Sequence, residues 1–89
     1  MISHTTDRFR KALKELPDHI QHQAKVAFEL WKKNPYHPSL RFKQIHSSKP
    51  IYSVRIGRGY RAIGIQEDEV MIWFWIGSHA DYDKLITQI

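Results

Sequence analysis

Residues 52–77 read YSVRIGRGYRAIGIQEDEVMIWFWIG, and their pattern decides the fold. Apolar and polar side chains alternate over 52–56, as in a strand that buries one face. Gly57 and Gly59 predict a hairpin turn, because glycine tolerates the positive φ that tight turns require. The return strand YRAIGIQ follows, and EDE at 67–69 predicts the next turn. The last run, VMIWFWIG, is apolar on both faces, which predicts a central strand packed on each side.

The alternation also assigns side chains to faces. Val54 and Ile56 belong to one face of their strand, and Arg55 belongs to the other. Trp73 and Trp75 are two residues apart, so we expect them on one face of the last strand. Large aromatic side chains in so apolar a run are typical of a core rather than of a platform for nucleobases.

Two helices are expected upstream of these strands. Thr5 or Thr6 can cap the first helix, over residues 7–16. Pro17 suits the first turn of the second, which ends near Lys33, before Asn34-Pro35. One apolar stripe marks that second helix: Ile20, Ala24, Ala27, Phe28 and Trp31. Only MISH precedes the first cap, so a strand before it would be very short or missing.

The remaining segments complete an α+β fold. SLRFKQI at 39–45 alternates and predicts another strand, and HADYDKLITQI at 79–89 predicts a short helix or a packed tail. We expect one domain over residues 1–89. In it, an N-terminal antiparallel helical hairpin packs on a three- to four-stranded, mainly antiparallel curved sheet, followed by the short C-terminal helix or tail. The helices would cover one sheet face fully and leave the other covered only in part.

The charge is unevenly distributed. The formal net charge is +5, and the stretch from Lys32 to Arg61 holds eight Lys or Arg residues and no Asp or Glu. A stretch of one sign favours a polyanionic partner, with nucleic acid first, although a solvated basic face without a ligand has the same composition. The absence of cysteine excludes disulfides and thiolate metal sites. No apolar run approaches the ~20 residues that cross a bilayer, so we expect a soluble, cytoplasmic protein.

YSVRIGRGYRAIG at 52–64, followed by an apolar strand and IGSHADYDKLI at 76–86, resembles the RelE/ParE superfamily of bacterial type II toxin–antitoxin toxins. The resemblance covers about Phe9 to Leu85 and implies the helical hairpin and curved sheet described above. Ser53 is a departure, because RNA-cleaving members often have a lysine there.

The resemblance implies a ribosome-dependent endoribonuclease that cuts mRNA by attack of the ribose 2′-hydroxyl, without a metal or other cofactor. Its partners would be the ribosome with its mRNA and a cognate acidic antitoxin, with no membrane. The implied catalytic residues are Arg61, as a clamp on the phosphate, His79, as acid or base, and Tyr82, which would stack on or orient the nucleotide. The implied phosphate-binding residues are Arg55, Lys43 and Arg41.

Other interpretations remain open. The ParE branch inhibits DNA gyrase without catalysis, and a decayed toxin or a plain basic RNA-binding domain would carry the same charge. Asp81 could pair with Arg61 or orient His79, and Tyr82 could simply anchor the C-terminal segment to the sheet. His19 and His22 have helical i, i+3 spacing, but no third ligand at matching spacing accompanies them.

Overall fold

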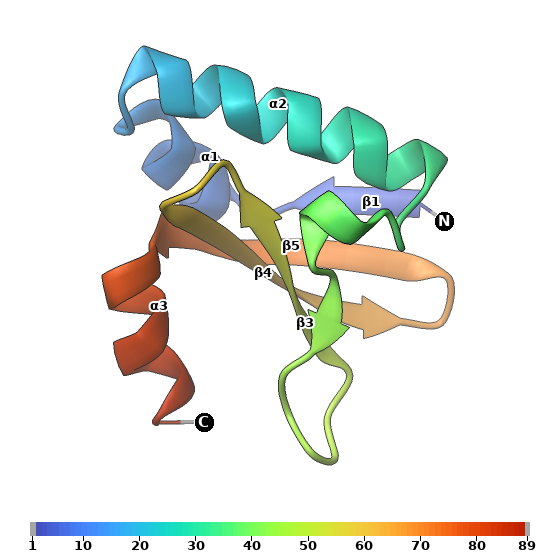
Figure 1. Ribbon diagram of the computed structural model, residues 1–89. Helices are drawn as coiled ribbons and strands as arrows, with labels where there is room; N and C mark the ends of the chain where they lie inside the picture. The colour runs from blue at the N-terminus through green and yellow to red at the C-terminus, as the bar shows by residue number, and fades with distance from the viewer. Residues whose placement is uncertain (1, 89) are drawn as a thin grey trace.

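The computed structural model describes residues 2–88, which form three α-helices and a five-stranded sheet (Figure 1). The chain order is β1 (Ile2–Thr5), α1 (Asp7–Lys14), α2 (Asp18–Lys33), the 3-10 helix η1 (Pro38–Leu40), β2 (Lys43–Gln44), β3 (Ile51–Ile56), β4 (Tyr60–Glu67), β5 (Val70–Ser78) and α3 (His79–Ile86). The strand order in the sheet is β1-β5-β4-β3-β2. The α+β class and the helical hairpin on one face are as the sequence predicts.

The strand β1 decides between two alternatives left open by the sequence. The segment before the first helix forms a very short strand of four residues, which pairs in parallel with β5 from Ile2 opposite Val70 to Thr5 opposite Trp73. Four residues give almost no periodic signal in a sequence, and the pairing depends on a partner far along the chain. With β1 at the edge, the apolar β5 becomes an inner strand, and the sheet has five strands rather than three or four.

The helices form largely where their caps place them. The Thr6 hydroxyl accepts a hydrogen bond from the Phe9 amide at 3.1 Å, which fixes the start of α1. This helix ends at Lys14 rather than at residue 16. The Glu15 and Leu16 amides bond to carbonyls three residues back, in tight turns that lead into Pro17. The bounds of α2 match the prediction, with Pro17 at its N-cap.

The expected strand over 39–45 is wrong for most of its length. Pro38 begins η1, and Arg41 then takes a left-handed conformation with φ of 46°, outside the β region of a regular strand. Strand pairing is left to Lys43 and Gln44 alone. Leu40 and Phe42 nevertheless both pack on the core, the shared side that strand alternation would also give them.

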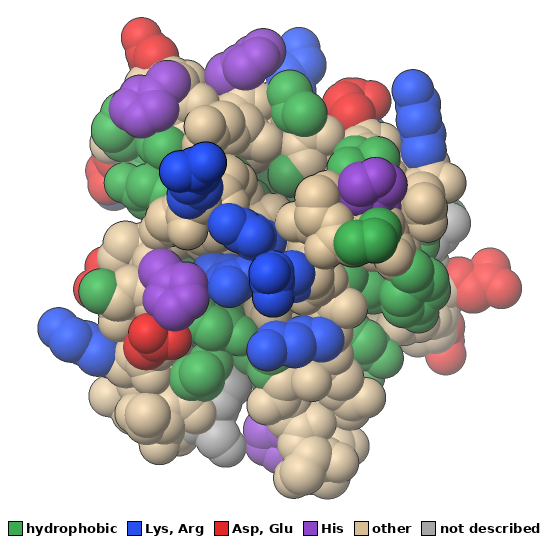
Figure 2. Space-filling model, viewed as in Figure 1, with side chains coloured by type: hydrophobic (Ala, Val, Ile, Leu, Met, Phe, Trp, Pro, Cys, Tyr) green, Lys and Arg blue, Asp and Glu red, His purple; other side chains and the backbone are tan. Residues whose placement is uncertain are grey.

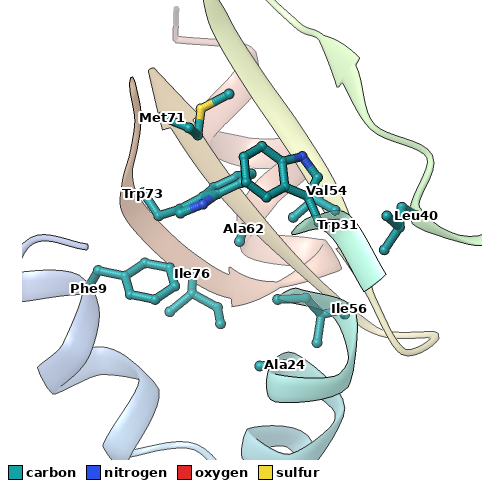
Figure 3. Packing of buried hydrophobic residues seen from close by; sticks show 11 residues of the cluster. Phe9, Ala24, Trp31, Leu40, Val54, Ile56, Ala62, Met71, Trp73 and Ile76 are labelled. Atoms are coloured by element: carbon teal, nitrogen blue, oxygen red, sulfur yellow. The ribbon is translucent and has the colours of Figure 1, made fainter. Parts of the chain in front are cut away.

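The main core lies between the helical hairpin and the sheet (Figure 3). Aromatic rings meet edge to face there, with the Trp73 ring centroid 5.4 Å from those of both Trp31 and Phe28. Val54, Ile56 and other strand residues complete this layer. None of the helices between residues 2 and 88 has the length and apolar character needed to cross a membrane.

A bulge in β5 corrects the placement of the tryptophans. Trp75 lies opposite Ile63 and Trp73 opposite Gly64, so one additional residue, Phe74, is inserted into β5. The insertion reverses the alternation. Trp73 therefore faces the helical hairpin, while Trp75 faces the other side of the sheet, where its ring lies beside α3.

Candidate functional site

Strand pairing gathers cationic side chains on the sheet face opposite the helical hairpin. Arg55 on β3 is the cross-strand partner of Arg61 on β4, and the partner of Arg61 on β5 is Gly77. Directly opposed like charges destabilise a sheet by themselves. The Trp75 ring fills the position over Gly77, where a Cβ would lie 2.7 Å from it. This register therefore places two arginine side chains next to each other on one face of the sheet.

The cationic surface extends toward the sheet edge. Lys43 on β2 pairs with Ser53, so its side chain lies on the same face as Arg55 and Arg61. Arg41 is close enough to Arg61 to lower the pKa of that guanidinium. We call Arg41, Lys43, Arg55 and Arg61 the basic strip. Figure 2 shows Lys and Arg side chains clustered at the centre of the viewed face, with a His and an acidic side chain beside them on the α3 side.

Arg61 is the member of the basic strip whose surroundings disfavour its positive charge. Burial lowers the pKa of its guanidinium most, and the positive charges of Arg55 and Arg41 lower it further, while Tyr82 and Asp83 raise it. Its Nε is buried and has no hydrogen-bond partner. The guanidinium carbon lies 5.7 Å from the centroid of the Tyr82 ring, in cation–π range. Because the Nε is out of reach of solvent, an anion would have to bind the terminal nitrogens of this guanidinium.

His79 lies at the start of α3, where Ser78 caps the helix by accepting a hydrogen bond from the Asp81 amide. The Nδ1 of His79 is 3.1 Å from a carboxylate oxygen of Asp83. The expectation that Asp81 orients His79 or Arg61 is not met in this geometry. Residues four apart share a helix face, whereas residues two apart do not, so Asp83 takes the position next to His79.

Tyr82 anchors α3 to the sheet. Its side chain is only 4% exposed, and its hydroxyl donates a buried hydrogen bond of 3.1 Å to the Ser53 hydroxyl. The Trp75 ring centroid is 6.4 Å away and that of His79 is 6.1 Å away. Tyr82 thus has no ring face open to a nucleobase here. The Arg61 guanidinium and the His79 ring both lie next to this one ring.

A comparison with known families decides what kind of domain this is. A family model described as the ParE-like toxin domain matches residues 18–84. The chain belongs to the ParE-like toxin family. No curated protein sequence matches it at a significant level.

Solved structures share the fold of this ParE-like toxin. The RelB–RelE antitoxin–toxin complex from Methanococcus jannaschii has a TM-score of 0.72 and 21% identity, covering 91% of this chain and 95% of that one. YafQ from E. coli has a TM-score of 0.68 and 18% identity, over 90% and 94%. The isolated E. coli RelE toxin has a TM-score of 0.67 and 16% identity, over 98% and 96%. At such identities the likeness is one of fold.

Within this toxin fold, the residues named from the sequence fall into two groups. Arg61, His79 and Tyr82 converge where α3 meets β4. Arg55 lies beside Arg61, although its Nε donates to the Gly57 carbonyl at 2.8 Å, which directs the side chain toward the β3–β4 turn. Lys43 and Arg41 are exposed and continue the basic strip toward the edge of the sheet.

Sequence reasoning missed two partners in this toxin. Asp83 was detectable, since its i+4 spacing from His79 on a predicted helix places the two side chains together. The bond from Tyr82 to Ser53 joins residues 29 positions apart and had no local signal. Among residues 2–88, no three His, Asp or Glu side chains converge on a common metal position. His19 and His22 accordingly have no third ligand within that range.

Proposed function

We propose that this ParE-like toxin belongs to a type II toxin–antitoxin system and cleaves mRNA on the ribosome. One observation carries the proposal: the Arg61 guanidinium is partly buried, lies beside a second arginine, and has a donor without a partner. A phosphodiester bound by the terminal nitrogens would supply the missing anion. Arginine suits this task because its planar fork binds two phosphate oxygens and stays charged at any physiological pH.

The reaction needs no group beyond side chains and substrate. The ribose 2′-oxygen loses its proton to a base and attacks the adjacent phosphorus. The bond from phosphorus to the 5′-oxygen breaks, that oxygen takes a proton, and a 2′,3′-cyclic phosphate remains. Negative charge increases on the phosphate oxygens in the transition state, where Arg61 and Arg55 would neutralise it. Preorganised cations contribute most to such a step, because they need no rearrangement as charge develops.

His79 is the candidate for proton transfer. Histidine is the side chain that ordinarily gains or loses a proton near neutral pH. The Asp83 carboxylate at Nδ1 favours the tautomer with hydrogen on that nitrogen, which leaves Nε2 to accept the 2′-hydroxyl proton. Tyr82 would act as a positioning residue, because it contacts both Arg61 and His79 from a buried and hydrogen-bonded place.

The proposal includes protein partners. The RelB–RelE structures from M. jannaschii and E. coli are complexes of a toxin with its antitoxin. We propose a cognate antitoxin for this chain as well, with an acidic segment that covers the basic strip. The run from Lys32 to Arg61 has no acidic residue to satisfy these charges internally. Binding there would block access of the ribosome-bound mRNA to Arg61.

The test is primer extension on a reporter mRNA after induction of the toxin. The wild-type chain should arrest growth and produce new 5′ ends, and Arg61→Ala should lower cleavage about 100- to 1,000-fold, as expected for loss of one preorganised donor. Arg58→Ala is the matched control, because Arg58 is exposed at the tip of the same hairpin. Intact mRNA in arrested cells, or cleavage unaffected by Arg61→Ala, would remove the basis of the proposal.

A second candidate function is inhibition of DNA gyrase without catalysis. It is favoured by the match to the ParE-like family model and by Ser53, which stands where RNA-cleaving members often have a lysine. Ser53 is 1% exposed under Tyr82, so it offers no charge to a phosphate. Purified toxin in a gyrase supercoiling assay separates the two functions. Inhibition that survives Arg61→Ala, with mRNA left intact, would favour this alternative.

A further inference from the structure

Tyr36 is a large aromatic residue that the core does not use. It lies in the loop between α2 and η1, and 76% of it is exposed, more than either of the other large exposed hydrophobics, Ile2 and Val26. A ring so open to water contributes little to folding. Its exposure raises the question of what it binds, since aromatic residues on a basic surface are typical of nucleic-acid sites.

The loop holds Tyr36 in a defined place. The His37 amide donates to the Asn34 carbonyl at 3.1 Å, which closes a turn with Pro35 and Tyr36 at its centre. The Nδ1 of His37 then accepts a hydrogen bond from the Ser39 amide and starts η1. Proline restricts φ next to Tyr36, so a ligand that binds the ring has less loop motion to immobilise.

The Tyr36 ring is the outer member of a row of aromatic contacts. Its centroid lies 5.7 Å from that of Phe42 with the rings tilted by 59°, and Phe42 stacks on Tyr52 at 5.0 Å with an interplanar angle of 17°. Phe42 also meets the core residue Trp31 edge to face at 5.9 Å. We call Tyr36, Phe42 and Tyr52 the aromatic ladder. Its inner end is anchored in the core, and its outer ring is left to solvent.

The aromatic ladder and the basic strip meet at the sheet edge formed by β2, on opposite faces of the sheet. Successive strand side chains point to opposite faces, so Phe42 and Tyr52 face α2 while Lys43 faces away from it. Arg41 links the two sets, because it precedes Phe42 and its charge acts on Arg61. A chain that contacts Arg61 and Arg41 with its phosphates would therefore reach Tyr36 by passing around this edge. The absence of acidic residues from Lys32 to Arg61 leaves nothing there to repel a polyanion.

We propose that Tyr36 is a stacking site for one unpaired nucleobase of the RNA, at a nucleotide that flanks the cut rather than at the cut itself. This inference rests on the proposed function, since it takes single-stranded RNA as the ligand. An aromatic face combined with neighbouring cations suits single-stranded nucleic acid, because every base has a π-face and every phosphate a charge. The site would add affinity and position the strand without taking part in proton transfer.

The test measures binding of a fluorescein-labelled, single-stranded RNA of about ten nucleotides by anisotropy at low salt. Tyr36→Ala should weaken binding about tenfold, whereas Tyr36→Phe, which keeps the ring, should bind as the wild type does. A ribose-phosphate oligomer of equal length without bases should bind wild type and Tyr36→Ala equally. Circular dichroism should show all three proteins folded, because this side chain is exposed.

Each contrary result has a distinct meaning. Equal RNA affinity of Tyr36→Ala and wild type overturns the stacking site and leaves the proposed function intact. Equal weakening with the base-free oligomer also overturns it, since the contact would then not involve a base. If Tyr36→Ala no longer binds an acidic antitoxin peptide but binds RNA as the wild type does, the ring belongs to a protein interface instead, and the stacking site is overturned. Absence of RNA binding by the wild type rejects the stacking site, whereas the proposed function is judged separately by cleavage of the reporter mRNA.

Discussion

The two faces of the sheet differ in what covers them. The helical hairpin seals one face with apolar side chains, including Trp73 and Val54, both 0% exposed. The other face has only the short helix α3, held by Tyr82, and its remaining area carries the basic strip. The sealed face contains the groups that stabilise the fold, and the partly covered face contains groups that are costly to place together. The residues that stabilise the fold and the candidate functional residues therefore lie on opposite faces of the same sheet.

The two tryptophans of β5 provide the largest test of this comparison. Trp73→Ala should lower the free energy of unfolding by about 3–5 kcal/mol, because it empties a fully buried site between Trp31 and Phe28. Trp75→Ala should cost about half as much, since Trp75 is only half-buried beside α3. Urea unfolding followed by circular dichroism measures both. Equal losses would mean that the second face contributes as much core as the first.

The attachment of α3 gives the next largest effect. Tyr82→Phe and Ser53→Ala should each cost about 1 kcal/mol, because each removes one partner of a buried hydrogen bond. The double variant should cost little more than either single one, since the lost bond is the same. Fully additive losses in this double-mutant cycle would show that the two hydroxyls do not bond to each other in solution.

The smallest effect is expected at the basic strip itself. Burial and the nearby Arg55 and Arg41 disfavour the charged form of Arg61, as its lowered pKa indicates. Removing that charge while keeping the volume, in Arg61→Met, should leave the free energy of unfolding within about 1 kcal/mol of the wild type or raise it. Added salt should then stabilise the wild type more than the variant, because salt screens repulsion between arginines. A large loss of stability in Arg61→Met would show that Arg61 stabilises the fold rather than serving a binding site.

Most of the architecture was predictable because it depends on local patterns. The Thr6 cap, the apolar stripe of α2 and the Gly57 turn act within a few residues, and they place the helices and the hairpins. Arg55 and Arg61 flank one turn, so their pairing across β3 and β4 also follows from local sequence. The same reasoning failed at residues 39–45, because the buried Leu40 and the left-handed Arg41 depend on the core that they meet.

The sequence by itself determined the α+β class, the helical hairpin, the antiparallel strands and the concentration of positive charge from Lys32 to Arg61. These follow from periodicity, caps, turn residues and composition, all of which act over short distances along the chain. Tertiary structure alone decided that β1 joins β5, that the bulge at Phe74 separates Trp73 from Trp75, and that Ser53 receives the Tyr82 hydroxyl. Each of these joins distant segments, or shifts a register by one residue, and packing rather than local preference selects among the possible arrangements.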